Sequence, residues 1–534
     1  MSQTDGGIFS IKPGHRPRRV PFAGCPFAVT DTDFSSLLGN DVDPVQAGVL
    51  LQRLAAAEDL SPPAILATLA EDPRRLADSD PAILAALFRL VHLRLLSGTG
   101  EALDSLPPGQ IRTIHDAVPA DTPNQALMLQ LLSMQSTDVA LTTLVECLKD
   151  RPPTAWVEAG QIIAPLMQRT GWNVDALFPA ILDCLSSPAL AAPILDLANY
   201  LTRRQQVARH PARDRLALMN HLLGEVAGRL GKFEEDPRTF GDDVETVQTR
   251  LGEAVALAVS LCDALGLIGD ESSIAKLNRA VELRHRRVQC EAAGALAMLG
   301  DDLGKKRLVE LSADPAARLR AIRYADELGF GDAIDEDQRS EQASAESELA
   351  LWLTQPQQMG VPPTGVEVLE TRRMMWPSFN DPVDVHLIRF EYNFGDRQYS
   401  NVGIAGPVAF ALAADVADLP HDDIFAIYAG WHAEHDEIFT VPGDRLNEAQ
   451  KRIVTPLRDA LDRAGYDEIK TELLGFFLDE TAAVFRARRE ERECLVITDG
   501  LETIDQITAG RPRPLQPGDL FNLFKGRKML RTFN

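Results

Sequence analysis

The chain has 534 residues, of which 45% are apolar and 25% charged, and its formal net charge is −24 at pH 7. This composition is that of a globular chain with enough apolar residues for several domain-sized cores. Nucleic acids and anionic membranes are bound mainly through Lys and Arg, so the negative charge disfavours both as partners. No run of 18 apolar residues and no apolar signal core occurs, so we expect neither a membrane span nor a secretory signal.

The six cysteines are far apart in the sequence and form no C-x-x-C pair. Most of them occur inside apolar segments, which indicates reduced core thiols and not a disulfide framework or a zinc site. We therefore expect a cytoplasmic protein.

The N-terminal part of the chain predicts helices. Residues 1–42 are rich in Gly, Pro and Arg and predict an extended arm. Over 43–249 nearly every segment has helical apolar spacing and is bounded by Pro, Gly, Ser or Asp, as in PAILAALFRLVHLRLL (81–96). We expect a diverged series of helical hairpins there, without strands.

Residues 250–334 contain a repeat. A Gly-Asp pair follows an apolar segment at 269/270, 300/301 and 331/332, so the period is 31 residues. A Gly at that place fits a helix C-terminus, where a positive φ is needed, and the Asp can cap the next helix. Each repeat is expected to hold a helix pair that buries its apolar face only by stacking on its neighbours.

At these residues the chain resembles the HEAT-like repeats of bacterial proteins, including the shorter kind named after the phycobilisome lyases. The resemblance implies an α-solenoid that binds other proteins; a groove that holds a chromophore is a variant of it. In such families an Asp and an Arg six residues apart often form a ladder between repeats. Asp314 and Arg320 match this pattern, but Leu283 and Gln289 stand one repeat earlier.

The composition changes after the repeats. Residues 335–346 are polar and acidic and predict a linker. In the segment 347–534, VDVHLIRFEYNF (383–394) and the following residues predict a hairpin, two helical segments come next, and three short strands follow over 473–500. The sequence therefore predicts a mostly α protein, in which a HEAT-like α-solenoid precedes a separate α+β domain with a mostly antiparallel sheet and a basic C-terminal tail.

A locally basic stretch within the repeats is one candidate site. Side chains at the same repeat position line up on a solenoid, so arginines there predict a surface for an acidic protein segment. The alternative is that these arginines neutralise acids of neighbouring repeats, such as Glu291. We call the five candidate residues the arginine face: Arg284, Arg286, Arg287, Arg318 and Arg320.

The stretch GWHAEHDEIF (430–439) is the second candidate. If its helix continues, His432, His435 and Asp436 share one face, and imidazoles with a carboxylate are suitable zinc or iron ligands. The spacing is not that of the H-E-x-x-H proteases. The alternative is an amphipathic helix with a polar last turn.

The sequence favours a non-catalytic adaptor or scaffold that binds a protein partner through the solenoid. P-loop, dinucleotide-binding, nucleophile-elbow and EF-hand motifs do not occur, and we expect no cofactor. Two alternatives stay open. One is an enzyme or metal-handling protein with its site around His432 and His435, and the other is a structural subunit of a large assembly.

Overall fold

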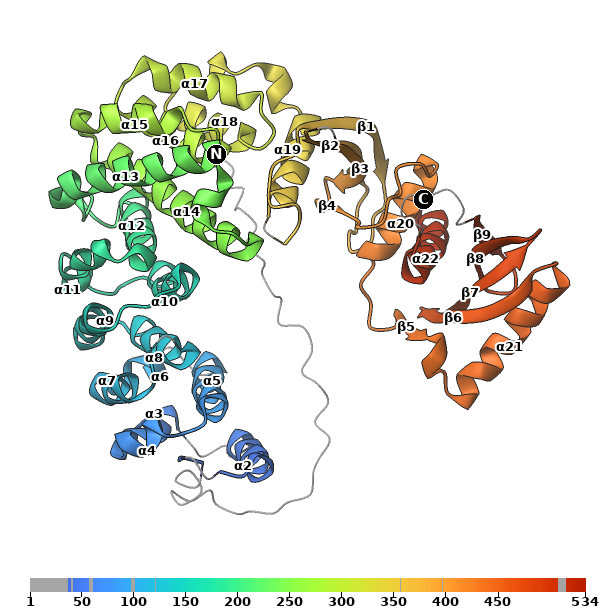
Figure 1. The fold of residues 1–534 in the computed structure, drawn as a ribbon, viewed down its shortest axis with the longest axis horizontal. Coiled ribbons are helices and arrows are strands. Elements are labelled where there is room, and N and C mark those ends of the chain that lie inside the picture. The colour runs from blue at the N-terminus through green and yellow to red at the C-terminus, as the bar shows by residue number, and fades with distance from the viewer. Residues whose placement is uncertain are drawn as a thin grey trace. The chain divides into compact units, whose positions relative to one another are not determined.

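A computed structural model gives the fold (Figure 1). It describes residues 37–39, 42–56, 61–97, 101–120, 122–355, 357–395, 397–507 and 515–534. The arm predicted for 1–42 lies almost entirely outside these residues. The chain forms two compact units, which divide between Leu197 and Ala198.

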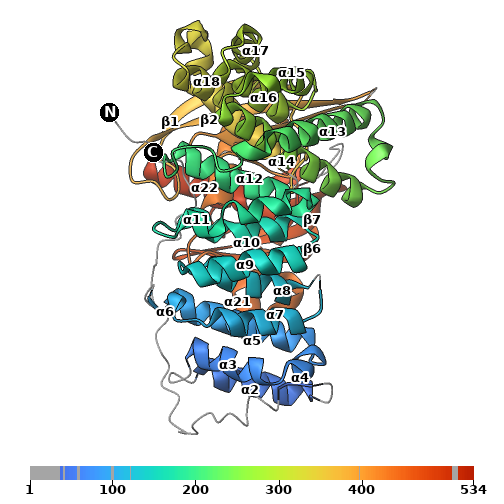
Figure 2. The ribbon, with the colours of Figure 1, turned by 90° about the vertical axis from the view of Figure 1, so that its left-hand side faces the viewer.

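The first unit consists of helices, as predicted for this part of the chain. Many of them begin with proline, whose missing N–H group costs nothing in the first helical turn and whose fixed φ suits a helix start. Figure 2 shows these helices following one another as stacked rows. The helices are α2 (Pro44–Ala56), α3 (Pro62–Glu71), α4 (Pro73–Ala77), α5 (Pro81–Ser97), α6 (Glu101–Asp104), α7 (Pro108–Ala117), α8 (Pro123–Ser133), α9 (Asp138–Asp150), α10 (Trp156–Gln168), α11 (Val174–Leu177), η1 (Ala180–Ser186) and α12 (Pro188–Arg203), which runs into the second unit.

Arginines bind successive helices of this unit together. Arg151, which follows α9, donates from Nη1 to the carbonyl oxygen of His115 at 2.6 Å and from Nη2 to that of Val118 at 2.8 Å. Both acceptors lie at the C-terminal end of α7, where the last carbonyls have no partner in the helix. The Arg151 guanidinium, at the end of α9, thus supplies hydrogen-bond donors to the free carbonyl groups at the C-terminal end of α7.

The second unit opens with helices that include the predicted repeats. The helix pairs α15–α16 and α17–α18 lie where the 31-residue period places them. The elements are η2 (Arg213–Arg215), α13 (Leu216–Glu235), η3 (Pro237–Phe240), α14 (Val244–Ile268), η4 (Glu271–Ser273), α15 (Ile274–Val281), α16 (Arg286–Met298), α17 (Asp302–Ser312), α18 (Arg318–Glu327), η5 (Gly331–Ala333) and η6 (Glu336–Arg339).

Two of the three predicted Gly-Asp helix ends are confirmed. Gly269 and Gly300 have φ of 74° and 82°, and the side chains of Asp270 and Asp301 accept hydrogen bonds from backbone N–H groups two residues later. The third prediction is wrong, because Gly329, with φ of 77°, follows the end of α18 instead of Gly331. The last repeat therefore ends two residues earlier than its sequence period suggests.

The linker predicted for 335–346 is also wrong. These residues form η6 and the beginning of α19 (Glu341–Leu353). Ala343 and Ala345 are buried, and α19 packs on both α18 and the sheet that follows. The small residues of this stretch allow α19 to pack closely on its neighbours, and most of its polar residues lie on the side that faces solvent. The polar composition that predicted a linker is therefore that of an amphipathic helix.

The C-terminal part has two antiparallel sheets, which confirms the α+β class but replaces the single predicted sheet. The first has strand order β1-β2-β3-β4 and the second β5-β6-β7-β8-β9. The predicted hairpin is β2–β3. The strands are β1 (Gly365–Met374), β2 (Val383–Phe394), β3 (Arg397–Ala405), β4 (Phe410–Ala411), β5 (Phe439–Pro442), β6 (Asp467–Phe477), β7 (Glu480–Arg489), β8 (Arg492–Thr498) and β9 (Thr503–Ile507).

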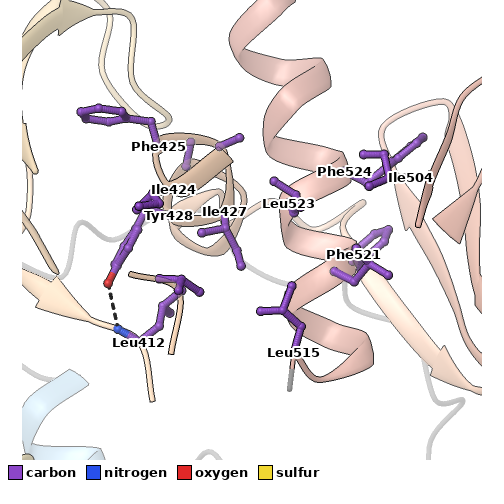
Figure 3. Close-up of a cluster of buried hydrophobic side chains, with 14 of the residues drawn as sticks. Leu412, Ile424, Phe425, Ile427, Tyr428, Ile504, Leu515, Phe521, Leu523 and Phe524 are labelled. Carbon is purple, nitrogen blue, oxygen red and sulfur yellow. Dashed lines mark hydrogen bonds between the residues drawn. The ribbon is translucent and has the colours of Figure 1, made fainter. Parts of the chain in front are cut away.

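Both sheets are covered by helices on both faces. On the first sheet, α19 packs against Ile388 and Phe390, and α20 (His421–His432) lies over Val385 and Leu387, which alternate with them. On the second sheet, α21 (Glu448–Arg463) covers one face and α22 (Pro517–Phe533) the other. Helices α20 and α22 pack on each other between the sheets (Figure 3).

The basic tail predicted at the C-terminus is a core helix. Within α22, Leu520, Phe521, Leu523 and Phe524 are at most 2% exposed. Gly526 lets α22 approach α20 closely, since a Cβ at this position would overlap the carbonyl oxygen of Ala426. The C-terminal residues are therefore part of the α+β fold.

One helix of the described chain, α14, has the length and composition of a membrane span. In its most apolar window of 18 residues, 61% of the residues are buried inside the protein. It packs between α13 and α16, so we interpret it as a core helix of the repeats.

Candidate functional site

Two residues of the arginine face join neighbouring repeats. Arg286 Nε donates to Asp314 at 2.5 Å, and Arg320 donates from Nε and Nη2 to the two carboxylate oxygens of Glu291 at 2.8 and 3.0 Å. The Tyr324 hydroxyl donates to the same carboxylate at 2.5 Å. Both arginines thus neutralise acids of the adjacent helix pair, as the alternative reading of the sequence predicted.

Asp314 and Arg320 belong to a ladder between repeats, although the position one repeat before Arg320 holds Gln289. The Gln289 side chain accepts a hydrogen bond from Arg286 at 2.9 Å and donates to the Val281 carbonyl at 3.3 Å. Both partners of Gln289 lie in its own helix pair, and Gln289 holds the Arg286 side chain that reaches Asp314.

Arg318 is the most deeply buried member of the arginine face, with 4% of its surface exposed. Its guanidinium donates to the backbone carbonyls of Ser312 and Ala343, at 3.1 and 2.6 Å, and to Glu346 at 3.0 Å. It joins the end of α17 to α19. A side chain held in this way cannot contact a partner, so its predicted role in partner binding is wrong.

The side chains of Arg284 and Arg287 are exposed. No ion pair of either side chain is recorded within the described part of the chain; the Arg284 backbone N–H donates to Glu234 at 2.6 Å. The structure thus divides the arginine face into three arginines that hold the fold together and two that face solvent.

The predicted metal residues do not come together. Helix α20 ends at His432, so His435 and Asp436 lie in the turn after it and the assumed helical spacing does not hold. Trp376 Nε1 donates to His432 Nδ1 at 3.0 Å, and His435 Nδ1 accepts from the Glu437 backbone N–H at 3.3 Å. In the residues that the structure describes, no group of three His, Cys, Asp or Glu side chains is arranged to hold a metal ion. The metal-site prediction is wrong.

His432 is instead a packing residue. Its ring stacks on Trp376, and burial lowers its pKa, which keeps the ring neutral so that Nδ1 can accept the indole N–H. The Nδ1 atom expected to bind a metal thus accepts a hydrogen bond from the indole of Trp376 at the edge of the core.

The same stretch nevertheless borders an open pocket of about 660 Å³. The turn after α20 and β5 form one side of it, and the first half of α22 forms the other. We call it the Lys525 pocket, and its lining is Ala433, Glu434, His435, Asp436, Ile438, Phe439, Thr440, Gly518, Phe521, Asn522 and Lys525.

Lys525 is the unusual residue of this pocket. It is 4% exposed, and burial lowers its pKa to about 8. Its ammonium lies 5.5 Å from the centre of the Phe521 ring, one turn earlier on α22. No carboxylate lies within ion-pair distance of it among the described residues. The next lysine on the helix, Lys528, pairs with Glu480 and Asp499.

Sequence reasoning missed Lys525 because it treated 524–533 as a basic tail. The signal was nevertheless present, since Leu520, Phe521, Leu523 and Phe524 have the spacing of one helix face. What the sequence could not show is that this face packs against α20, and that Lys525 is buried with it.

The chain has no match among protein-family models, curated proteins or solved structures.

Proposed function

We propose that this protein is an adaptor whose HEAT-like repeats bind a protein partner. The observation that carries the proposal is the division of the arginine face. Arg286, Arg318 and Arg320 fix the register of successive helices, whereas Arg284, in the turn before α16, and Arg287, in its first turn, stay exposed. A rigid helical stack that presents unneutralised cations is suited to stoichiometric binding.

The expected partner is an acidic protein segment. A carboxylate pairs with Arg in a bidentate geometry, and charges at the rim of an interface mainly raise the association rate and the specificity. The net charge of −24 disfavours a nucleic acid. The cysteines that the structure describes are unpaired and buried, which supports action in the cytoplasm.

The test uses the full-length chain, because α19 joins the repeats to the first sheet and a cut at 335–346 would disrupt both. Tagged wild-type protein, the double variant Arg284→Glu/Arg287→Glu and a control with Lys451→Glu/Lys470→Glu are incubated in native lysate. The control lysines have 58% and 77% of their side chains exposed and lie outside the repeats. Quantitative mass spectrometry compares the retained proteins.

We expect one protein at near-stoichiometric amount on the wild type and the control, and a loss of about tenfold or more on the arginine variant, with unchanged thermal unfolding. Equal retention on all three baits would exclude Arg284 and Arg287 from the binding surface. Several proteins retained at fixed ratios would favour a structural subunit of an assembly.

A further inference from the structure

The Lys525 pocket contains the ammonium group of Lys525, and no carboxylate of the described residues lies within ion-pair distance of it. Burying an ammonium ion without a partner is unfavourable, and buried charges in proteins are normally paired. Lys525 is 4% exposed, yet it lines an open pocket of about 660 Å³ and not a closed core. An anionic group that enters the pocket would supply the missing pair.

The rest of the lining restricts what that anion can be. Phe521 and the half-exposed Phe439, whose ring stacks on Phe476 at 4.7 Å, give the pocket apolar surface. Glu434 and Asp436 also line it and would repel further negative charge. A ligand with one negative charge and a flat apolar body therefore fits better than a phosphate or a dicarboxylate.

We propose that the Lys525 pocket binds a small monocarboxylate with a flat apolar body, whose carboxylate pairs with the Lys525 ammonium. The apolar body contacts Phe439 and Phe521, and the open side faces solvent. This inference is independent of the adaptor function, because it involves no residue of the repeats.

The first experiment measures binding of 4-fluorobenzoate to the full-length protein by ¹⁹F NMR, with 4-fluorobenzamide as the neutral analogue. We expect a dissociation constant of about 1 mM or lower for the carboxylate and at least about tenfold weaker binding of the amide. Equal binding of the two, or no binding of either, would overturn the proposal. This comparison requires no variant.

The second experiment replaces the cation. Lys525→Met keeps an unbranched side chain of similar size and removes the charge, and Lys451→Met is the exposed control. We expect Lys525→Met to weaken 4-fluorobenzoate binding by about tenfold or more and to leave the unfolding temperature unchanged or higher, because a buried unpaired charge is lost. A lysine with a purely structural role would give the reverse, namely unchanged binding and a lower unfolding temperature.

The third readout is pH. The ammonium form of Lys525 binds the carboxylate, so affinity should be constant below pH 8 and fall by up to about tenfold per pH unit above it. His435, Glu434 and Asp436 also line the pocket. The series therefore runs from about pH 7.5 upward, across the range in which the proposal requires the Lys525 ammonium to titrate. An affinity that is flat up to pH 10 would contradict the role of Lys525.

Discussion

The helical repeats and the C-terminal layers both bury basic side chains, but they use them differently. In the repeats, Arg318 and Arg320 each donate to a carboxylate of a neighbouring helix, and Arg318 also donates to the Ala343 carbonyl on α19. In the C-terminal layers, Lys525 lies at a pocket, and no carboxylate of the described residues is within ion-pair distance of its ammonium. A paired buried charge contributes to the fold, whereas an unpaired one at a pocket indicates a ligand. The two regions should therefore respond in opposite ways when the cation is removed.

The largest effect is expected from Arg320→Met. The variant leaves the Glu291 carboxylate, with 6% of its side chain exposed, without its ion-pair partner. Loss of one partner of a buried pair costs about 3–5 kcal/mol of unfolding free energy. Urea unfolding measures it.

Arg287→Met, at the exposed position of the same face, is the matched control and should change the unfolding free energy by less than about 0.5 kcal/mol. Similar losses of unfolding free energy in both variants would mean that the Arg320–Glu291 pair stabilises the fold no more than an exposed arginine does.

A pH-dependent loss of stability is expected from His210. The ring is 4% exposed, Nε2 bonds to Asn199 Oδ1 at 2.9 Å and Nδ1 accepts from the Ala212 backbone N–H at 3.2 Å. Burial lowers its pKa from 6.5 to about 4, so the unfolded chain binds the proton more tightly. The stabilisation is complete above pH 6.5 and is lost as the pH falls toward 4, by up to about 3 kcal/mol.

The measurement is the unfolding free energy of wild-type protein and His210→Gln between pH 7 and pH 4. Other buried histidines and the carboxyl groups contribute equally to both proteins, so the difference isolates His210. If the two curves stay parallel, His210 does not titrate in this range in the folded state.

A smaller effect is expected where α20 and α22 cross. In Gly526→Ala the new methyl group meets the carbonyl oxygen of Ala426, and the helices must move apart. Overpacking of this kind costs about 1–3 kcal/mol.

Gly518→Ala, on the same helix with open space around its Cβ position, should be neutral or slightly stabilising. Thermal unfolding compares the two variants. An equal loss in both would show that the glycines matter for the chain conformation and not for the helix contact.

Parts of the fold follow from the sequence because the signals are local. Helix positions follow from apolar spacing and from proline at helix starts. Gly269 and Gly300 end their helices, since each needs a positive φ. The hairpin β2–β3 follows from strand alternation. The sequence was misleading where local composition and packing disagree, as at α19, whose small polar residues suggested a linker.

The tertiary structure alone decided which charged side chains are buried and which groups they pair with. The arginine ladder pairs residues 28 or 29 positions apart, and Lys525 is buried because α22 packs between the sheets against α20. Side-chain spacing predicts which residues share a helix face, but not which face meets another element. The sequence therefore determined the repeat helices, the hairpin β2–β3 and the helix ends at Gly269 and Gly300. The roles of Arg318, His432 and Lys525 depend on contacts between distant segments, because burial and pairing of a charge are properties of the packed chain.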